Sequence, residues 1–479
     1  MDRSLSLGVL LFALPALAQE QLGIANSNYA GTDAVALNPA RLSGQWPWMD
    51  IRVLGVDAFV WNDHVFLGRN AHSFWGDVRG GLNGTLGDFT VNGSLAPGKR
   101  EAFVSAAVHG PAIAMSMGKS SFGAHISTRL ATSAVGISAE LARFLVNGLG
   151  YGPQQGIRYE DGNVRISSAA WTEAGISYAR ILYSHGYQLI TAGATVDYLM
   201  GHHGMAVRFD KLDYTVIDSM QLRIHQATGR YAFAEPGLQN GSGLGFDVGM
   251  QYIRTLSETD RYLPHRASTG CDPLLYRWRA GLSLIDLGAI SYSRPYTGSF
   301  TAAEAYFPDY TAIDVSDVEG ADSLLRSNFT RSTTDPRMRI GLPTALSAQV
   351  DVNVAPNVYI AADLVQNVAP VSSLRLRRPN SLGIVPRFET KRFEVALPVV
   401  LREYDLRKPS VGLMVRLNNI VVGSDHVLPM LARTDIYGLD LYVRVKWTIF
   451  KGPYCNGKKQ LQHSPGDRNA LPCTAPPTG

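Results

Sequence analysis

The sequence predicts an all-β fold: a transmembrane antiparallel β-barrel of about 14 strands with an N-terminal hatch and long extracellular loops. Three observations support this prediction. The chain starts with an export signal, its composition is rich in apolar and poor in charged residues, and apolar and polar residues alternate over long segments. The expected parts are a signal peptide at 1–18, a hatch at 19–48, a barrel at 49–450 and a periplasmic tail at 451–479.

The first residues have the pattern of a signal peptide. Arg3 precedes an apolar stretch from Leu5 to Leu17, which ends in the small-x-small site Ala16-Leu17-Ala18. The stretch is too short to span a bilayer, so we expect cleavage after Ala18 and export to the bacterial outer membrane. A buried N-terminal core helix is the alternative interpretation.

Composition narrows the class of protein. Apolar residues make up 46% of the chain and charged residues only 18%, below the ~25% of soluble domains. No later segment offers about 18 consecutive apolar residues, so no transmembrane helix is expected. A closed barrel is the other structure that satisfies every backbone group in lipid. The net charge of +4 is too small to indicate a nucleic-acid partner.

Alternation is clearest in the last apolar segment, between 437 and 449. Large apolar side chains occupy every second position, and Gly, Asp, Arg, Lys and Thr lie between them. This period of two is typical of a strand with one face toward lipid and one toward a wet interior. The apolar positions are Tyr437, Leu439, Leu441, Val443, Val445, Trp447 and Ile449.

The same pattern predicts roughly fourteen strands, an even number as in bacterial single-chain barrels. Short turns and long loops alternate between them, except that 256–273 is long on the short side. The long loops are 63–101, 132–169, 201–242, 295–343 and 368–379. The strands are expected at 49–62, 102–118, 121–131, 170–184, 187–200, 243–255, 274–294, 344–355, 357–367, 380–389, 391–401, 409–418, 420–428 and 437–450.

The inward positions of these strands are polar and of mixed charge. Buried charges must pair or meet water, so these residues either tie the wall to a plug or line a wet lumen. The expected lumen-lining residues are Arg129, Glu173, Asp197, Asp247, Arg277, Arg279, Asp351, Asp363, Arg416, Arg444 and Lys446.

The segment 19–45 is rich in Gly, Ala, Asn and Ser and shows no strand alternation. It carries more apolar residues than a disordered tail, among them Ile24 and Leu37, which favours a compact segment packed inside the lumen. Pro39 fixes a bend there and biases Asn38 away from helical geometry.

Residues 23–43, with the motif Asn38-Pro39-Ala40, resemble the N-terminal segment of FadL-like outer-membrane proteins. The resemblance implies that these three residues lie inside the barrel as part of a hatch. The stretches 283–288 and 422–425 resemble the PorV-like branch of Bacteroidota outer-membrane proteins, which includes subunits of type IX secretion.

The resemblance implies a gated channel or transporter for small or amphipathic molecules. The alternative is a non-catalytic barrel subunit of an outer-membrane assembly such as a type IX secretion-type complex. FadL proper moves long-chain fatty acids through an apolar pocket, and the mixed-charge lumen expected here does not fit that substrate.

A barrel-embedded hydrolase is the third possibility considered, and no Gly-x-Ser-x-Gly, His-Glu-x-x-His or Walker sequence supports it. The protein is therefore expected not to be an enzyme and to need no cofactor. His202 and His203 are neighbours that point opposite ways in extended backbone, so we expect a solvated loop tip and no metal site.

Two loops suggest partners. Arg375, Arg377 and Arg378 fall in an expected outer loop, where they either pair with lipopolysaccharide phosphates or form a solvated basic surface. The sequence of loop 295–343 predicts an extended segment followed by a short helix, and the length of the loop favours a lid or docking surface. Expected partners are outer-membrane lipid and lipopolysaccharide, with other outer-membrane or periplasmic proteins as further candidates.

The chain contains three cysteines. Cys455 and Cys473 share the expected periplasmic tail, an oxidising location, so the sequence predicts a disulfide between them. Cys271 would then be unpaired.

Overall fold

A computed structural model describes residues 21–455 except 68–90, 94–97, 267–269, 294, 303, 310–329, 333–337, 370–373 and 428–434. The predicted signal peptide, Cys473 and the middle of loop 295–343 lie outside the described residues. Within them, no helix is long and apolar enough to cross a membrane.

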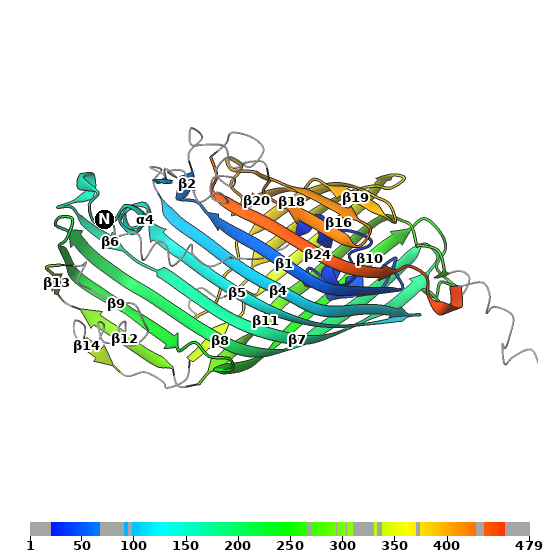
Figure 1. The fold of residues 1–479 in the computed structure, drawn as a ribbon, viewed down its shortest axis with the longest axis horizontal. Coiled ribbons are helices and arrows are strands. Elements are labelled where there is room, and N and C mark those ends of the chain that lie inside the picture. The colour runs from blue at the N-terminus through cyan, green and yellow to red at the C-terminus, as the bar shows by residue number, and fades with distance from the viewer. Residues whose placement is uncertain are drawn as a thin grey trace, which may run out of the picture.

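Fourteen antiparallel strands form a closed barrel in the described part of the chain, because β1 is hydrogen-bonded to β4 on one side and to the last strand, β24, on the other (Figure 1). Two of the fourteen are each interrupted and carry two labels. Around the barrel the strands are β1 (Met49–Asn62), β4 (Lys99–Met117), β5 (Ser120–Ser138), β7 (Val164–His185), β8 (Gln188–Val216), β10 (Gly241–Thr255), β11 (Tyr276–Tyr292), β16 (Ala345–Ala355), β17 (Val358–Asn367), β18 (Ser381–Glu389), β19 with β20 (Phe393–Ala396, Val399–Arg402), β21 with β22 (Ser410–Val411, Leu413–Leu417), β23 (Ile420–Ser424) and β24 (Gly438–Ile449).

Each predicted strand corresponds to one of these fourteen, and the fold class is confirmed. The alternation also assigns the faces of β24 correctly. Leu439, Leu441 and Trp447 are exposed on the outside, whereas Arg444 and Lys446 are buried on the inside. The period of two therefore located both the strands and their inner faces.

The prediction that 201–242 is a loop was wrong. Strand β8 runs on to Val216, and the chain returns as β9 (Leu222–Ala234), which pairs with β8 along its length. β9 in turn pairs with β12 (Tyr296–Ala302) and β13 (Ala305–Phe307), so loop 295–343 begins as strands.

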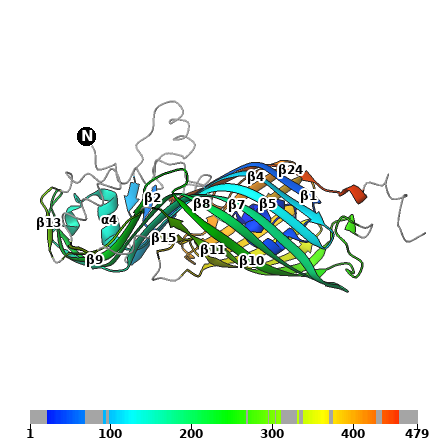
Figure 2. The same ribbon diagram turned by 90° about the horizontal axis from the view of Figure 1, so that it is seen from below.

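These strands form an extension of the wall beyond one end of the barrel, seen at the left in Figures 1 and 2. Strand β6 (Arg158–Asp161) joins it through β8, and helix α4 (Ala139–Asn147) packs Phe144 against an apolar cluster that includes Tyr214, Tyr231 and Phe300. Polar residues such as Lys211 and Asp213 interrupt the apolar pattern of β8, which explains why the sequence suggested a loop. The remaining short elements are β2 (Val65–Leu67), β3 (Val91–Gly93), β14 (Thr330–Ser332), β15 (Met338–Gly341), η3 (Gly152–Gln154) and η6 (Pro453–Cys455).

A β-bulge in β11 places one predicted lumen residue, Arg277, outside the lumen. The pairing of β10 with β11 shifts register between Arg254–Trp278 and Thr255–Tyr276, so an extra residue, Arg277, enters β11. Tyr276 is consequently buried inside and Arg277 is exposed. A bulge reverses the face of every residue beyond it, which strict alternation cannot anticipate.

The disulfide prediction is also corrected. Cys455 is bonded to Cys271, not to Cys473. Tertiary packing explains this pairing, because the long turn between β10 and β11 lies beside the end of β24. There Trp48 donates its backbone N–H to Phe450, and Trp46 donates its indole N–H to the carbonyl of Leu274.

We expect mass spectrometry without reduction to recover the peptides of Cys271 and Cys455 as one cross-linked species, with Cys473 open to alkylation. A cross-link between Cys455 and Cys473 would contradict the observed packing of the turn against the tail. Digestion after reduction is the control, since it should release both peptides separately.

Candidate functional site

Residues 21–48 lie inside the barrel and are called the hatch below (dark blue in Figure 2). The hatch contains α2 (Leu22–Ala25) and two 3₁₀ turns, η1 (Gly31–Ala36) and η2 (Pro39–Leu42). Asn38 is extended, with φ −162° and ψ 110°, and its side chain accepts the backbone N–H of Ala40. Its amide group donates to Gln349 and to the carbonyl of Met250 on the wall. The structure thus places Asn38, Pro39 and Ala40 in the lumen, fully buried.

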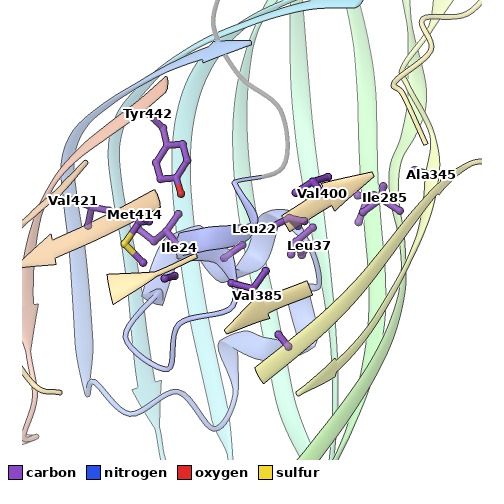
Figure 3. Packing of buried hydrophobic residues seen from close by; sticks show 14 residues of the cluster. Leu22, Ile24, Leu37, Ile285, Ala345, Val385, Val400, Met414, Val421 and Tyr442 are labelled. Atoms are coloured by element: carbon purple, nitrogen blue, oxygen red, sulfur yellow. The ribbon is translucent and has the colours of Figure 1, made fainter. Parts of the chain in front are cut away.

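The apolar side of the hatch packs on one part of the wall. Leu22, Ile24 and Leu37 contact a cluster of wall residues that includes Val385 and Met414 (Figure 3). Gly23 sits so close to Tyr442 and Met414 that any side chain there would overlap them. These contacts remove apolar surface from water and fix the orientation of α2 in the lumen.

Asp33 is the central charged contact of the hatch. Its carboxylate is 2.9 Å from Lys446 Nζ, 3.1 Å from Arg444 Nε and 3.2 Å from Arg52 Nη1. Burial alone would raise the pKa of Asp33, but these three cations hold it well below its usual range. Arg444 also binds Asp57 of β1 with two nitrogens, so one guanidinium joins β24, β1 and the hatch.

A second network holds the other end of the hatch. Arg387 makes two hydrogen bonds with Asp351, at 2.9 and 2.7 Å, and Arg279 pairs with the same carboxylate at 2.7 Å. Arg279 also donates to the side-chain oxygen of Asn28, whose backbone N–H donates to Glu389. Every one of these wall residues is nine-tenths buried or more.

Two more hatch residues bind wall carboxylates directly. The amide group of Asn26 donates to Asp363 at 2.6 Å, and the hydroxyl of Ser27 donates to Glu394 at 2.8 Å. Glu394 is itself paired with Arg416, whose guanidinium lies over the ring of Tyr29. Six predicted lumen residues therefore bind the hatch or its immediate partners: Arg279, Asp351, Asp363, Arg416, Arg444 and Lys446.

A cavity of about 180 Å³ remains in the lumen beside the hatch. The hatch lines it with Gln21, Ala25, Thr32, Asp33 and residues 35–37, and the chain at 377–379 also lines it. Its wall comes from strands β1, β4, β5, β7, β8, β10, β11 and β24. The cavity is smaller than the 300–1,000 Å³ typical of drug-sized ligand sites, so it suits a few waters or one small molecule.

Charged side chains gather at the β5–β11 side of this cavity. Four of the predicted lumen residues lie here: Arg129, Glu173, Asp197 and Asp247. His125 joins them, with Nε2 3.3 Å from Asp197 and 3.8 Å from Glu173. Glu173 also accepts the indole N–H of a buried tryptophan and pairs with Arg129 at 3.2 Å.

Asp286 belongs to this group, although alternation from Leu284 places it on the outer face. It has a left-handed φ of 53° at an irregularity in β11 and turns its carboxylate inward. There Arg129 binds both carboxylate oxygens, at 2.9 and 3.0 Å, and the Asp286 backbone N–H donates to Asp247. The sequence did carry a signal of this bulge, because Asp286 falls at a position that alternation assigns to the apolar outer face.

Residues 374–380, called the mouth segment below, cover the cavity on the side of the extension. Arg377 pairs with Glu101 and Glu403 at 3.0 and 3.1 Å, and Arg378 pairs with Asp286 inside the lumen. Arg377 and Arg378 thus pair with carboxylates of this chain, in place of the expected solvated basic surface, and lipopolysaccharide binding stays a prediction. Arg375 donates to the hydroxyl of Thr344.

The paired histidines lie in a strand, which corrects the expected loop tip. His202 and His203 belong to β8, and His202 Nε2 is 2.8 Å from the hydroxyl of Thr172 on β7. Among the described residues, no group of three or more His, Cys, Asp or Glu side chains is placed to hold a metal ion.

Several site residues were missed by the sequence reasoning. His125 has the same parity in its strand as Arg129, so alternation could have found it. Asp57 was hidden by an irregularity after Arg52, and Asp33 by the absence of any regular pattern in the hatch.

The fold and lumen define a class: a closed 14-stranded barrel with an N-terminal hatch packed inside it. The chain belongs to a family of unknown function (DUF5723), whose model matches residues 98–425. No curated protein matches the sequence.

Three solved structures illustrate what the chain is similar to. The toluene transporter TbuX of Ralstonia pickettii has 12% identity and a TM-score of 0.42, with 91% of this chain and 99% of that chain covered. The toluene transporter TodX of P. putida has 10% identity and a TM-score of 0.37, with 87% and 92% covered. A FadL homologue of Pseudomonas aeruginosa has 9% identity and a TM-score of 0.21, with 87% and 93% covered.

Proposed function

We propose that this barrel spans the bacterial outer membrane. The support is its outer face, where large apolar side chains stand exposed on neighbouring strands while charged residues face inward. Ile176 is 68% exposed and Trp447 is 63% exposed, which in water would favour aggregation. Lipid contact on that face, with every backbone group paired around a closed sheet, removes this cost.

Replacing Leu441 with Arg is expected to lower the free energy of unfolding in phospholipid vesicles by about 2–4 kcal/mol, because the charge would enter lipid. Leu441 is 45% exposed on the outer face of β24. Thr448→Arg should cost less, since Thr448 faces inward and hydrogen-bonds Asp50. Reversible denaturant unfolding measures both, and equal costs would contradict the assignment of faces.

We further propose that the protein is a gated channel for small molecules, closed by the hatch. One observation carries this proposal: a cavity inside the lumen is bounded by the hatch on one side and by the mouth segment on the other. Both boundaries are held by ion pairs and hydrogen bonds to the wall rather than by continuous β-sheet. Such contacts can be exchanged for water when the hatch moves, without opening the barrel itself.

Deleting residues 20–45 is expected to raise single-channel conductance in planar bilayers while the barrel still folds. The wall keeps its own backbone pairing in this variant, so folding can be verified by circular dichroism and by heat-dependent migration in gels. Unchanged conductance in a folded deletion variant would contradict closure by the hatch and would assign closure to the mouth segment and outer loops.

A second candidate function is a non-catalytic subunit of an outer-membrane assembly. The extension favours it, because β8, β9, β12 and β13 continue the wall beyond the barrel and offer a surface for another protein. Purification from native membranes tests this alternative. The alternative is supported if a stoichiometric partner copurifies and is lost when β9 and β12 are each replaced by a short linker. Purification as a single chain would oppose it.

A further inference from the structure

Two carboxylates in the cavity have no lysine or arginine partner among the described residues. Asp197 on β8 and Asp247 on β10 lie on adjacent strands and both line the cavity. Asp197 is 8% exposed, and its Oδ1 accepts no hydrogen bond. A ring nitrogen of His125 lies 3.3 Å from Asp197 Oδ1, and His125 is a cation only when protonated. Asp247 accepts the backbone N–H of Asp286.

On the β5–β11 side of the cavity, the charges of the described residues do not balance. Glu173, Asp197, Asp247 and Asp286 supply four carboxylates, whereas Arg129 and Arg378 supply two guanidiniums. Both guanidiniums bind Asp286, and Arg129 also binds Glu173. Asp197 and Asp247 are therefore left over. A buried carboxylate needs either a proton or a cation to offset its desolvation.

The shape of the cavity distinguishes its two sides. Gly175 has no Cβ, and the carboxylate of Asp197 and the ring of His125 occupy the space that a Cβ would fill. The carboxylate of Asp197 is in this way set back into the wall. Away from them the lining is mixed. Its polar part includes Arg52, Asp57, His109 and Arg444, and its apolar part comes from both wall and hatch: Leu37, Phe59, Phe103, Leu130 and Ile285.

We propose that the cavity binds a small organic ammonium ion with an apolar body. Its head group lies between Asp197 and Asp247 and donates hydrogen bonds to both, while its body lies against Phe59, Phe103 and Leu37. This inference rests on the proposed channel function in that the cavity would be the binding site for the transported molecule. An ammonium ion fits better than a bare metal ion, because the described carboxylates and His125 lack the spacing of metal ligands.

Three probes of equal ring size test the charge preference: benzylamine, benzyl alcohol and benzoate. Calorimetric titration of the full-length protein in detergent should detect benzylamine at about 10-fold or more higher affinity than either of the others. The double variant Asp197→Asn/Asp247→Asn keeps the shape but not the charge, and it should lose about 10-fold or more of the affinity for benzylamine. Asp260→Asn removes a carboxylate outside the cavity, in the turn between β10 and β11, and as the control it should bind benzylamine like the parent.

Equal affinity for the three probes, or unchanged benzylamine binding in the folded double variant, would overturn the proposal. Absence of benzylamine binding to the parent would do so too, and would mean that protons alone neutralise the pair. If the double variant does not fold, the comparison of the three probes on the parent still tests the proposal. Failure here leaves the conductance of the hatch deletion untouched, so it is distinguishable from failure of the channel function.

Discussion

Replacement of Arg444 with Met is expected to lower the free energy of unfolding by about 3–5 kcal/mol. The guanidinium is buried and binds Asp57 on β1 and Asp33 in the hatch. Removing it leaves Asp57 with His109 as its remaining ionic partner among the described residues, at the seam where β1 and β24 close the barrel. Removing one partner of a buried carboxylate costs far more than the pair itself contributes.

The matched control is Arg407→Met. Arg407 also forms an ion pair with an aspartate, Asp405, but its side chain is 83% exposed. Its removal should change the free energy of unfolding by no more than about 1 kcal/mol. Arg444→Lys should fall between the two, because an ammonium cannot reproduce the forked contact with Asp57. Denaturant unfolding of the three variants in the same vesicles gives the comparison, and equal small effects would contradict the role of Arg444.

The barrel was predictable because lipid and a polar lumen impose opposite chemistry on the two faces of each strand. Strand 437–450 carries this signal along its whole length, so even its ends were found within a few residues. The extension carries no such signal. Beyond Met200 strand β8 leaves the barrel, and its residues face α4 and solvent in a different pattern.

The site was less predictable, and bulges are the main reason. One extra residue at Arg277 and the irregular backbone at Asp286 each reverse the inner face, which moves one charge out of the lumen and another into it. Contacts between distant segments are the second reason. The bond between Cys271 and Cys455 depends on how a turn packs against the chain end, and spacing in sequence does not report that.

The proposed channel opens by movement of the hatch, and Asp33 is the only acidic residue between 21 and 48. Asp33→Asn removes the carboxylate that holds Arg52, Arg444 and Lys446 while keeping the size of the side chain. We expect this variant to conduct more than the parent, because hydrogen bonds to charged groups contribute about 1.5–3 kcal/mol each and three of them hold the hatch here.

A reversible lock in the Asp33→Asn background tests this movement most directly. Ser43 in the hatch and Ser121 on β5 have hydroxyl oxygens 3.3 Å apart, so cysteines at both positions can form a disulfide that ties hatch to wall. Ser116 on β4 is also 3.3 Å from Ser121, so Ser116→Cys/Ser121→Cys is a matched wall-to-wall control. The reductant also breaks the native disulfide, and this control shows what effect that has on conductance.

The decisive measurement is single-channel conductance of the two locked variants before and after reduction. We expect the oxidised hatch-to-wall lock to return conductance to the parent level and reduction to raise it again, while the wall-to-wall control conducts equally in both states. Undiminished conductance through the oxidised hatch-to-wall lock, with the disulfide verified by mass spectrometry, would contradict a hatch that closes the barrel.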